Sequence, residues 1–222
     1  MARQDAPAPA DPVDPWLEGV PVTSRRLIEA AIDAFAQDGY HATTTRDIAN
    51  RVGMSPAALY VHFPSKAALL GQISRLGHAA AADLVRTALA SAPDPLGRLQ
   101  AVAGRFAAWH AEHHRVARIV QNELAALLPE DREAVRLLRR QIEQSVGEVV
   151  RAGVAAGVMR AGDERAVARA VLSLSVDVAR WYEPGGRETP EAIGALYAEL
   201  AARMVGATPA GRAPGETSAR EA

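Results

Sequence analysis

Residues 43–70 read TTTRDIANRVGMSPAALYVHFPSKAALL, and this stretch carries the clearest structural signal in the chain. Thr44 precedes Asp47 by three residues, which is the spacing of a capping box at the start of a helix. Gly53 ends this short helix, and the Ser-Pro pair that follows is a favourable start for another. The stretch therefore predicts two short helices joined by a tight turn, the helix-turn-helix arrangement.

Helical patterns continue on both sides of this stretch, and strand patterns are nearly absent. Before it, apolar residues from Thr23 to Gln37 recur on one face of a helix that Gly39 ends. After it, Pro64 breaks the third helix and longer amphipathic segments follow. These segments cover Ser65–Ser91, Asp94–His113, Arg115–Leu128, Asp131–Ala156, Glu164–Tyr182 and Pro190–Val205. We therefore predict an all-α fold.

The same patterns predict the domain organisation. A three-helix helix-turn-helix domain is expected at residues 23–70. It is joined to a larger helical domain at residues 71–206, which is expected to bind an effector and to form a dimer. The two ends of the chain, residues 1–22 and 207–222, are rich in proline and polar residues, so we expect them to be disordered.

The composition narrows the classes of function. The chain has 222 residues, of which 49% are hydrophobic, and a formal net charge of −1, so any nucleic-acid site must be local. It has no cysteine, which removes disulfides, thiolate metal sites and cysteine nucleophiles. No apolar run is long enough for a membrane helix, and no enzyme motif stands out. We expect a cytoplasmic protein that is not an enzyme.

The second helix of the helix-turn-helix has side chains that suit DNA recognition. Its leading residues must be small or able to hydrogen-bond if they are to approach base edges in the major groove. Ala57 and Ala58 are small enough to approach thymine methyl groups, and Ser55 can face phosphate together with the free N–H groups of the helix start. Contacts to the phosphate walls of the groove are expected from Tyr60, His62 and Lys66. The alternatives are that Tyr60 belongs to the core and that His62 is a solvated surface residue.

Residues 43–70 resemble the DNA-binding signature of the TetR/AcrR transcriptional regulators. The resemblance is carried by Ile48, Ala49, Gly53, Ser55, Leu59, Tyr60, His62, Phe63, Lys66 and Leu69. It implies phosphate or groove-edge contacts from Thr44, Thr45 and Arg46, base contacts from Ser55, Pro56, Ala57 and Ala58, and backbone contacts from Tyr60, His62 and Lys66. Pro56 departs from the family pattern, which often has a polar or basic residue there. Base reading is then expected to depend more on Thr45, Arg46 and Ala57.

One helix-turn-helix reads only half a site, so a regulator of this kind needs a homodimer and a palindromic double-stranded operator. The last two helices are the expected interface, because each has an apolar stripe that a symmetry mate could cover. One stripe comprises Val167, Ala170, Val171, Leu174 and Val178, and the other comprises Ile193, Leu196, Tyr197, Leu200 and Met204. An alternative is that both stripes face only their own domain.

A small hydrophobic effector is expected to bind between helices lined by aromatic side chains and a few polar groups. The candidate residues are Phe106, Trp109, His110, His113, Ile119, Glu123, Asp177 and Trp181. The alternative that Trp109 and Trp181 fill the core has equal weight. His110 and His114 have helical i, i+4 spacing, but the segment lacks the metalloprotease pattern H-E-x-x-H. We therefore expect neither a metal nor a cofactor.

The stretch DVARWYEPGG at 177–186 resembles the C-terminal domains of TetR-type regulators of lipid, fatty-acid or steroid breakdown. That resemblance implies an apolar acyl ligand, with an acyl-CoA thioester as one candidate. We therefore expect a homodimeric, sequence-specific repressor that its ligand releases from DNA. Two alternatives stay open: a regulator that senses an unrelated drug-like compound, and a helical ligand-binding or interaction protein without DNA binding.

Overall fold

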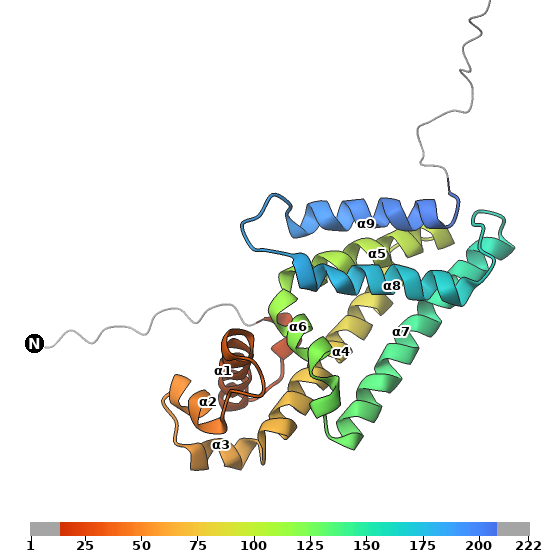
Figure 1. Ribbon diagram of the computed structural model, residues 1–222. Helices are drawn as coiled ribbons and strands as arrows, with labels where there is room; N and C mark the ends of the chain where they lie inside the picture. Colours follow the sequence, from red (N-terminus) through yellow and green to blue (C-terminus); the bar gives the residue numbers. More distant parts are fainter. Residues whose placement is uncertain (1–13, 208–222) are drawn as a thin grey trace, which may run out of the picture. The chain divides into compact units, whose positions relative to one another are not determined.

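The structure, a computed structural model, describes residues 14–207 of the chain. Every regular element within this range is helical, which confirms the predicted all-α fold. The elements are η1 (Pro15–Leu17), α1 (Val22–Asp38), α2 (Thr45–Arg51), α3 (Pro56–His62), α4 (Lys66–Ala90), α5 (Pro95–Glu112), α6 (His114–Asn122), η2 (Leu124–Ala126), α7 (Pro129–Ala155), α8 (Glu164–Trp181) and α9 (Pro190–Met204) (Figure 1). Of the predicted disordered ends, 1–22 and 207–222, residues 1–13 and 208–222 lie outside the described residues.

The chain divides into two compact units that interleave along the sequence. The first comprises residues up to Ala80 together with 115–138, and the second comprises 81–114 together with the residues from Arg139 onward. Helices α4 and α7 each contribute one part to each unit. The structure therefore differs from the contiguous division at residue 70, because α6 and the first part of α7 pack into the core of the first unit.

The core of the first unit unites helices that are far apart in the sequence. Its fully buried members include Leu27 and Ile28 of α1, Ile48 of α2 and Leu59 of α3. Helix α6 adds apolar side chains to the same cluster, namely Val116, Ile119 and Val120. Burying each large aliphatic side chain stabilises the fold by about 1.5–3 kcal/mol. The short helices α2 and α3 thus depend on tertiary packing, since helices of this length are marginal on their own.

An ion pair and a histidine–carboxylate contact attach α6 to α1 and to the loop that follows α1. Arg115 at its start lies 2.7 Å from Asp33 of α1. Glu123, directly after its end, lies 3.4 Å from His41 in the loop between α1 and α2. These exposed pairs add little stability by themselves, but together with the buried apolar face they set the position of α6.

The segment before α1 is more ordered than the sequence suggests. Pro15–Leu17 form a 3-10 helix, and Leu17 is only 1% exposed in the core of the first unit. Trp16 packs against the same core. The predicted disordered leader at 1–22 therefore extends too far. The proline-rich and acidic composition predicted disorder here, but burial of the apolar Leu17 side chain stabilises an ordered conformation of the segment.

The second unit is built around α5, which packs against both α8 and α9 (Figure 1). Its apolar core includes Val102 and Phe106 of α5, Val146 of α7 and Val171 of α8. Gly104 of α5 and Gly194 of α9 lie at the contact between those two helices. A Cβ atom on Gly104 would lie only 2.9 Å from the carbonyl oxygen of Gly194, so the two backbones approach directly.

Candidate nucleic-acid interface

The predicted capping box is present at the start of α2. The Thr44 hydroxyl accepts a hydrogen bond from the Asp47 amide at 3.2 Å, and the Asp47 carboxylate accepts one from the Thr44 amide at 2.9 Å. The Thr44 hydroxyl also donates to that carboxylate at 2.6 Å. These hydrogen bonds from Thr44 lower the pKa of Asp47, because they stabilise its charged form. They also fix the direction in which α2 leaves the preceding loop.

The turn between α2 and α3 has the geometry that its glycine permits. Gly53 adopts a φ of 69°, a conformation that side chains with a Cβ rarely adopt. The carbonyl of Val52 accepts a hydrogen bond at 3.1 Å from Arg26 of α1, which fastens the turn to the first helix. The hydroxyl of Ser55 accepts a hydrogen bond from the Ala58 amide at 3.2 Å and so caps α3. The same hydroxyl still has its own proton to donate.

Helix α3 buries one face and exposes the other. Leu59 is fully buried and Phe63, directly after the helix, is 7% exposed. On the opposite face, Ala57 is exposed and Val61 is 83% exposed. These two residues are four positions apart, so they lie on the same side of the helix. Val61 was not among the predicted contacts, although its helical spacing from Ala57 could have revealed it.

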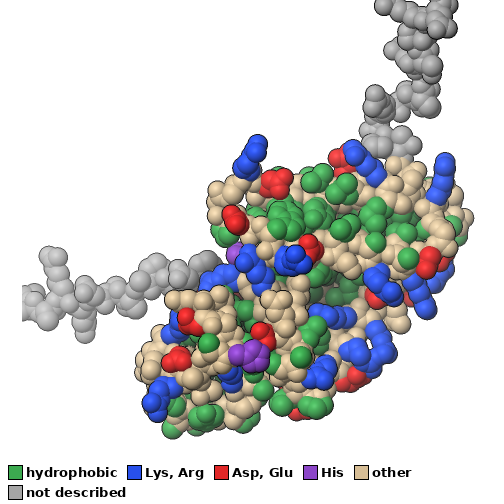
Figure 2. All heavy atoms as spheres, in the orientation of Figure 1, with side chains coloured by type: hydrophobic (Ala, Val, Ile, Leu, Met, Phe, Trp, Pro, Cys, Tyr) green, Lys and Arg blue, Asp and Glu red, His purple; other side chains and the backbone are tan. Residues whose placement is uncertain are grey.

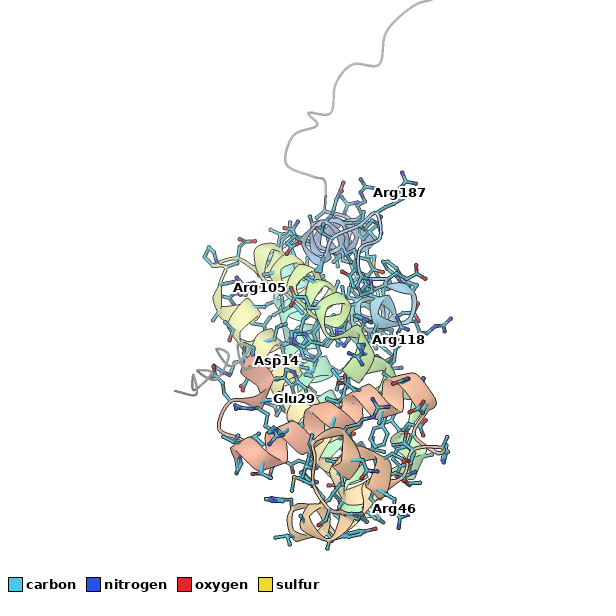
Figure 3. All side chains as sticks on the ribbon, turned by 90° about the vertical axis from the view of Figure 1, so that its left-hand side faces the viewer. Asp14, Glu29, Arg46, Arg105, Arg118 and Arg187 are labelled. Atoms are coloured by element: carbon cyan, nitrogen blue, oxygen red, sulfur yellow. The ribbon has the colours of Figure 1, made fainter. Side chains whose placement is uncertain are left out.

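Two predicted phosphate contacts are held in place by hydrogen bonds to neighbouring helices. The Tyr60 hydroxyl lies 3.0 Å from the Thr45 hydroxyl of α2, and Tyr60 is half exposed at 50%. His62 Nδ1 lies 3.3 Å from the hydroxyl of Ser24 in α1. Arg46 is exposed on α2 (Figure 3). The outer surface of α2 and α3 therefore presents hydroxyl, imidazole and guanidinium groups around a small apolar patch.

Lys66 has a different environment from the other predicted DNA contacts. Its ammonium donates to the backbone carbonyls of Tyr40, His41 and Thr43 at 2.7, 3.3 and 2.7 Å. It also lies 4.4 Å from the centre of the Tyr40 ring. A lysine has three N–H donors, and all three are used within the unit. A contact between Lys66 and phosphate stays a prediction, and the structure provides a second role for this residue.

The predicted effector residues do not all belong to one unit. Ile119 is 6% exposed in the core of the first unit, and Glu123 of that unit pairs with His41. The other predicted residues lie in the second unit. Ile119 was grouped with them because it follows α5 closely in the sequence, but α6 packs with the DNA-recognition helices. A ligand contact by Ile119 or Glu123 stays a prediction.

Four of the predicted residues form an aromatic cluster on α5. The His110 ring lies edge-on to Phe106 and Trp109 at centroid distances of 4.4 and 5.0 Å. His113 stacks on Trp109 at 4.6 Å. His110 and His113 each place Nδ1 within hydrogen-bond distance of the carbonyl four residues earlier. Within residues 14–207, no group of three or more metal-ligating side chains is placed to hold an ion.

The two predicted residues on α8 lie near its exposed end. Trp181 is 44% exposed and hydrogen-bonds to Tyr197 of α9, and Asp177 lies 3.5 Å from Arg180. Burial raises the pKa of Tyr197, and the charge of Asp177 adds to the effect. Trp181 therefore lies at the α8–α9 contact of its unit and does not fill the core.

These features define a helix-turn-helix DNA-binding regulator, and comparison with known proteins specifies the family. The family model of bacterial regulatory proteins of the tetR family matches residues 27–73. The model of the tetracyclin repressor-like C-terminal domain matches residues 92–205. The chain belongs to the TetR family of transcriptional regulators, whose members bind DNA and are not enzymes.

Individual relatives agree with this assignment. The transcriptional repressor KstR2 of Mycobacterium tuberculosis is 33% identical over 183 residues, which cover 79% of this chain and 90% of KstR2. The structure of that ketosteroid transcriptional regulator is similar with a TM-score of 0.75, 29% identity, and coverage of 83% of this chain and 96% of KstR2.

Two further solved structures share the fold. A tetR-family regulatory protein from Rhodococcus RHA1 has a TM-score of 0.80 and 37% identity, with 85% of this chain and 99% of that chain covered. AibR in complex with isovaleryl coenzyme A and operator DNA has a TM-score of 0.72 and 24% identity, with 80% and 96% covered. None of the helices within residues 14–207 has the length and hydropathy needed to cross a membrane.

Proposed function

We propose that this protein is a homodimeric repressor that binds a palindromic operator and is released by a small apolar effector. The observation that carries the DNA-binding part is the exposed surface of α2 and α3, where Tyr60 and His62 are held by Thr45 and Ser24. The similarity to the repressor KstR2 supports repression as the mode of action. As a bacterial regulator, it would act in the cytoplasm, where its operator lies.

A second copy of the chain is the proposed partner, and α8 and α9 are the proposed interface. Both helices expose large apolar side chains, and Figure 2 shows hydrophobic groups gathered over them. The exposed members are Leu174, Trp181, Leu196, Leu200 and Met204, each between 37% and 47% exposed. Exposed apolar groups gathered in this way are typical of an interaction surface.

The interface differs in part from the predicted stripes. Val171, Val178 and Ile193 were expected to face a partner, but they are 3% exposed or less and pack within their own unit. The alternative that the stripes face their own domain therefore holds for these three residues. The remaining apolar surface follows the outer sides of the same two helices, so an isologous four-helix contact is still the arrangement that covers it.

Helix α4 supplies evidence for a space that an effector could fill. Gly77 is buried, yet a Cβ atom at this position would have no heavy atom within 4 Å. One turn earlier, the hydroxyl of Ser74 is fully buried and has no hydrogen-bond partner among the described residues. A buried hydroxyl without a partner is costly, and a bound ligand with a polar group would remove that cost.

These observations support an apolar ligand with at least one polar group. The similarity to KstR2, described as a ketosteroid transcriptional regulator, is consistent with an effector from lipid or steroid breakdown. An acyl-CoA thioester is our specific candidate. Release from DNA requires only that the effector prefers the conformation that cannot bind DNA. A hundredfold loss of operator affinity corresponds to a preference of about 2.7 kcal/mol.

Selection of bound sequences from a random DNA pool tests the DNA-binding proposal. A dimeric specific binder enriches a palindrome at near-physiological salt, and the enriched DNA carries two copies of the protein. A reporter placed behind the selected operator then separates repression from activation. Enrichment of a single, non-repeated half-site would contradict the homodimer, and higher reporter expression in the presence of the protein would contradict repression.

Thermal-shift measurements with acyl-CoA thioesters of different chain lengths test the effector proposal. We expect Gly77→Leu, which fills the space beside α4, to abolish the shift while operator binding is retained. Ala79→Leu, on an exposed position of the same helix, is the matched control and should respond as the unaltered protein does. A shift with an unrelated drug-like compound and none with any acyl-CoA would overturn this choice of effector.

A further inference from the structure

The backbone between α1 and α2 forms a compact turn whose carbonyls point at one side chain. Gly39 ends α1 with a φ of 83°, and the hydroxyl of Thr43 donates to the Gly39 carbonyl at 2.8 Å. Thr43 is 2% exposed and Tyr40 is 7% exposed, whereas Gly39, His41 and Ala42 of the same turn are exposed. Its outward carbonyls converge on the Nζ atom of Lys66, the first residue of α4.

The position of these contacts in the chain gives them a specific consequence. Thr43 immediately precedes the cap of α2, and Lys66 begins the helix that follows α3. The hydrogen bond between Lys66 and the Thr43 carbonyl therefore joins the two ends of the helix-turn-helix segment, across a sequence separation of 23 residues. The ammonium group of Lys66, at one end of the segment, thus holds the backbone at the other end.

The chemistry of the site favours lysine over arginine. Lys66 is the only lysine among the 25 Lys and Arg residues of the chain. Three carbonyls that converge on one point suit a compact ammonium with three donors, whereas a guanidinium presents its donors in a fixed plane. The Tyr40 ring lies against the same ammonium at 4.4 Å, which adds a cation–π contact.

We propose that Lys66 is a positioning residue that ties the two ends of the helix-turn-helix together in the free protein. In this role its ammonium holds the turn at residues 40–43 and thereby sets the start of α2. The carboxylate of Glu123, after α6, is the nearby counter-charge. Burial lowers the pKa of Lys66, and Glu123 acts in the opposite direction. DNA affinity then depends on Lys66 through the geometry of α2 and α3.

Hydrogen exchange in the absence of DNA distinguishes this role from a phosphate contact. We expect Lys66→Met and Lys66→Arg to accelerate amide exchange in residues 40–51 by about tenfold, because the carbonyls of the turn lose the donor that they share. Both variants should also weaken binding to an operator selected from a random DNA pool. Arg46→Met is the control: it should weaken DNA binding and leave exchange in the free protein unchanged.

Reductive methylation provides a second test that requires no folded variant. The reaction keeps the positive charge of Lys66 but replaces its N–H donors with methyl groups. Because Lys66 is the only lysine, the terminal amine is the only other amine that reacts. Methylated Lys66→Arg protein controls for the terminal amine. Faster exchange in residues 40–51 after methylation supports the proposal. The proposal is overturned if amide exchange is unchanged in Lys66→Met and in the methylated protein, while Lys66→Arg binds the operator as tightly as the unaltered protein. That result would mean that Lys66 acts only through its positive charge.

Discussion

At the residue scale, two side chains on the proposed DNA-binding surface also bond to neighbouring helices. Tyr60 bonds to Thr45, and His62 bonds to Ser24, so each is oriented before DNA arrives. Such preorganisation reduces the entropy lost on binding. Val61 differs from them, because it is 83% exposed and its side chain has no polar group to satisfy. An exposed valine on a recognition helix suits a thymine methyl group.

This contact can be tested with modified DNA. We expect Val61→Ser to weaken operator binding by about 1 kcal/mol, the lower end of the range for a base contact. Replacing the operator thymines with deoxyuridine should weaken binding by the unaltered protein and have less effect on the variant. Val158→Ser, at an exposed valine of the second unit, is the control and should bind normally. Equal sensitivity of both proteins to deoxyuridine would refute the contact.

Asp47 gives a pH dependence with a defined sign. Its pKa is lowered in the folded protein by hydrogen bonds from Thr44, so the folded state is stabilised at pH values above the ordinary carboxyl pKa of about 3.9. That stabilisation is lost as the pH falls through the lower, folded value. Melting temperatures of the protein and of Asp47→Asn should therefore differ at neutral pH and converge in acid. A difference that persists below the folded pKa would contradict this assignment.

At the element scale, the position of each helix depends on how closely its neighbour can approach and on which core its apolar face joins. Helices α5 and α9 approach closely because Gly104 and Gly194 lack side chains where the two helices meet. Helix α6 follows α5 directly in the sequence, yet it packs with α1 in the other unit. The contacts of Arg115 with Asp33 and of Glu123 with His41 hold its two ends. Helices α5 and α6 are therefore neighbours in the sequence but belong to different units, because their apolar faces pack into different cores.

The α5–α9 contact predicts the effect of adding one methyl group. A Cβ on Gly104 would meet the Gly194 backbone at 2.9 Å, so Gly104→Ala should destabilise the second unit by about 1–3 kcal/mol despite the better helix propensity of alanine. Gly147→Ala on α7 is the matched control, because its nearest neighbour, the Ala168 Cβ, would lie at an ordinary 4.0 Å. Denaturant unfolding measures both, and equal stability of the two variants would contradict the close contact.

At the scale of the whole molecule, the two units share α4 and α7, and they divide the tasks between them. The first unit contains the helix-turn-helix, and the second exposes the apolar surface of α8 and α9. The proposed dimer follows from that surface, since a lone protomer would leave five large apolar side chains of α8 and α9 between 37% and 47% exposed. In this proposal, specific operator binding depends on residues of the second unit as well as on the helix-turn-helix of the first.

A charge placed in the proposed interface tests this dependence. Leu196→Glu should convert the protein to a monomer in analytical ultracentrifugation and lower its affinity for a full palindrome by on the order of 100-fold, because the second half-site no longer contributes through linkage. Leu137→Glu, at a 53% exposed leucine on α7, is the control and should remain dimeric. A Leu196→Glu protein that still sediments as a dimer would exclude this interface.

Much of the DNA-binding surface could be predicted from the sequence because its signals are local. The Thr44–Asp47 cap and the turn at Gly53 each involve residues a few positions apart. The effector residues were harder, because aromatic content does not reveal which unit a helix joins. Ile119 was placed in a ligand site for this reason and lies in the core of the first unit. The predicted phosphate contact of Lys66 stays a prediction, and its carbonyl partners could not be found from local patterns because they are more than 20 residues away.

The sequence by itself determined that the chain is helical, where the helix-turn-helix lies and which family the protein belongs to. Periodicity, caps and glycine turns act over one or two turns of helix, so they can be recognised without the fold. Only the tertiary structure decided that α6 joins the first unit, that Leu17 is anchored in a core and that Val171, Val178 and Ile193 face inward. These outcomes depend on which apolar faces pack against each other. That pairing involves segments distant in the sequence, so local patterns do not reveal it.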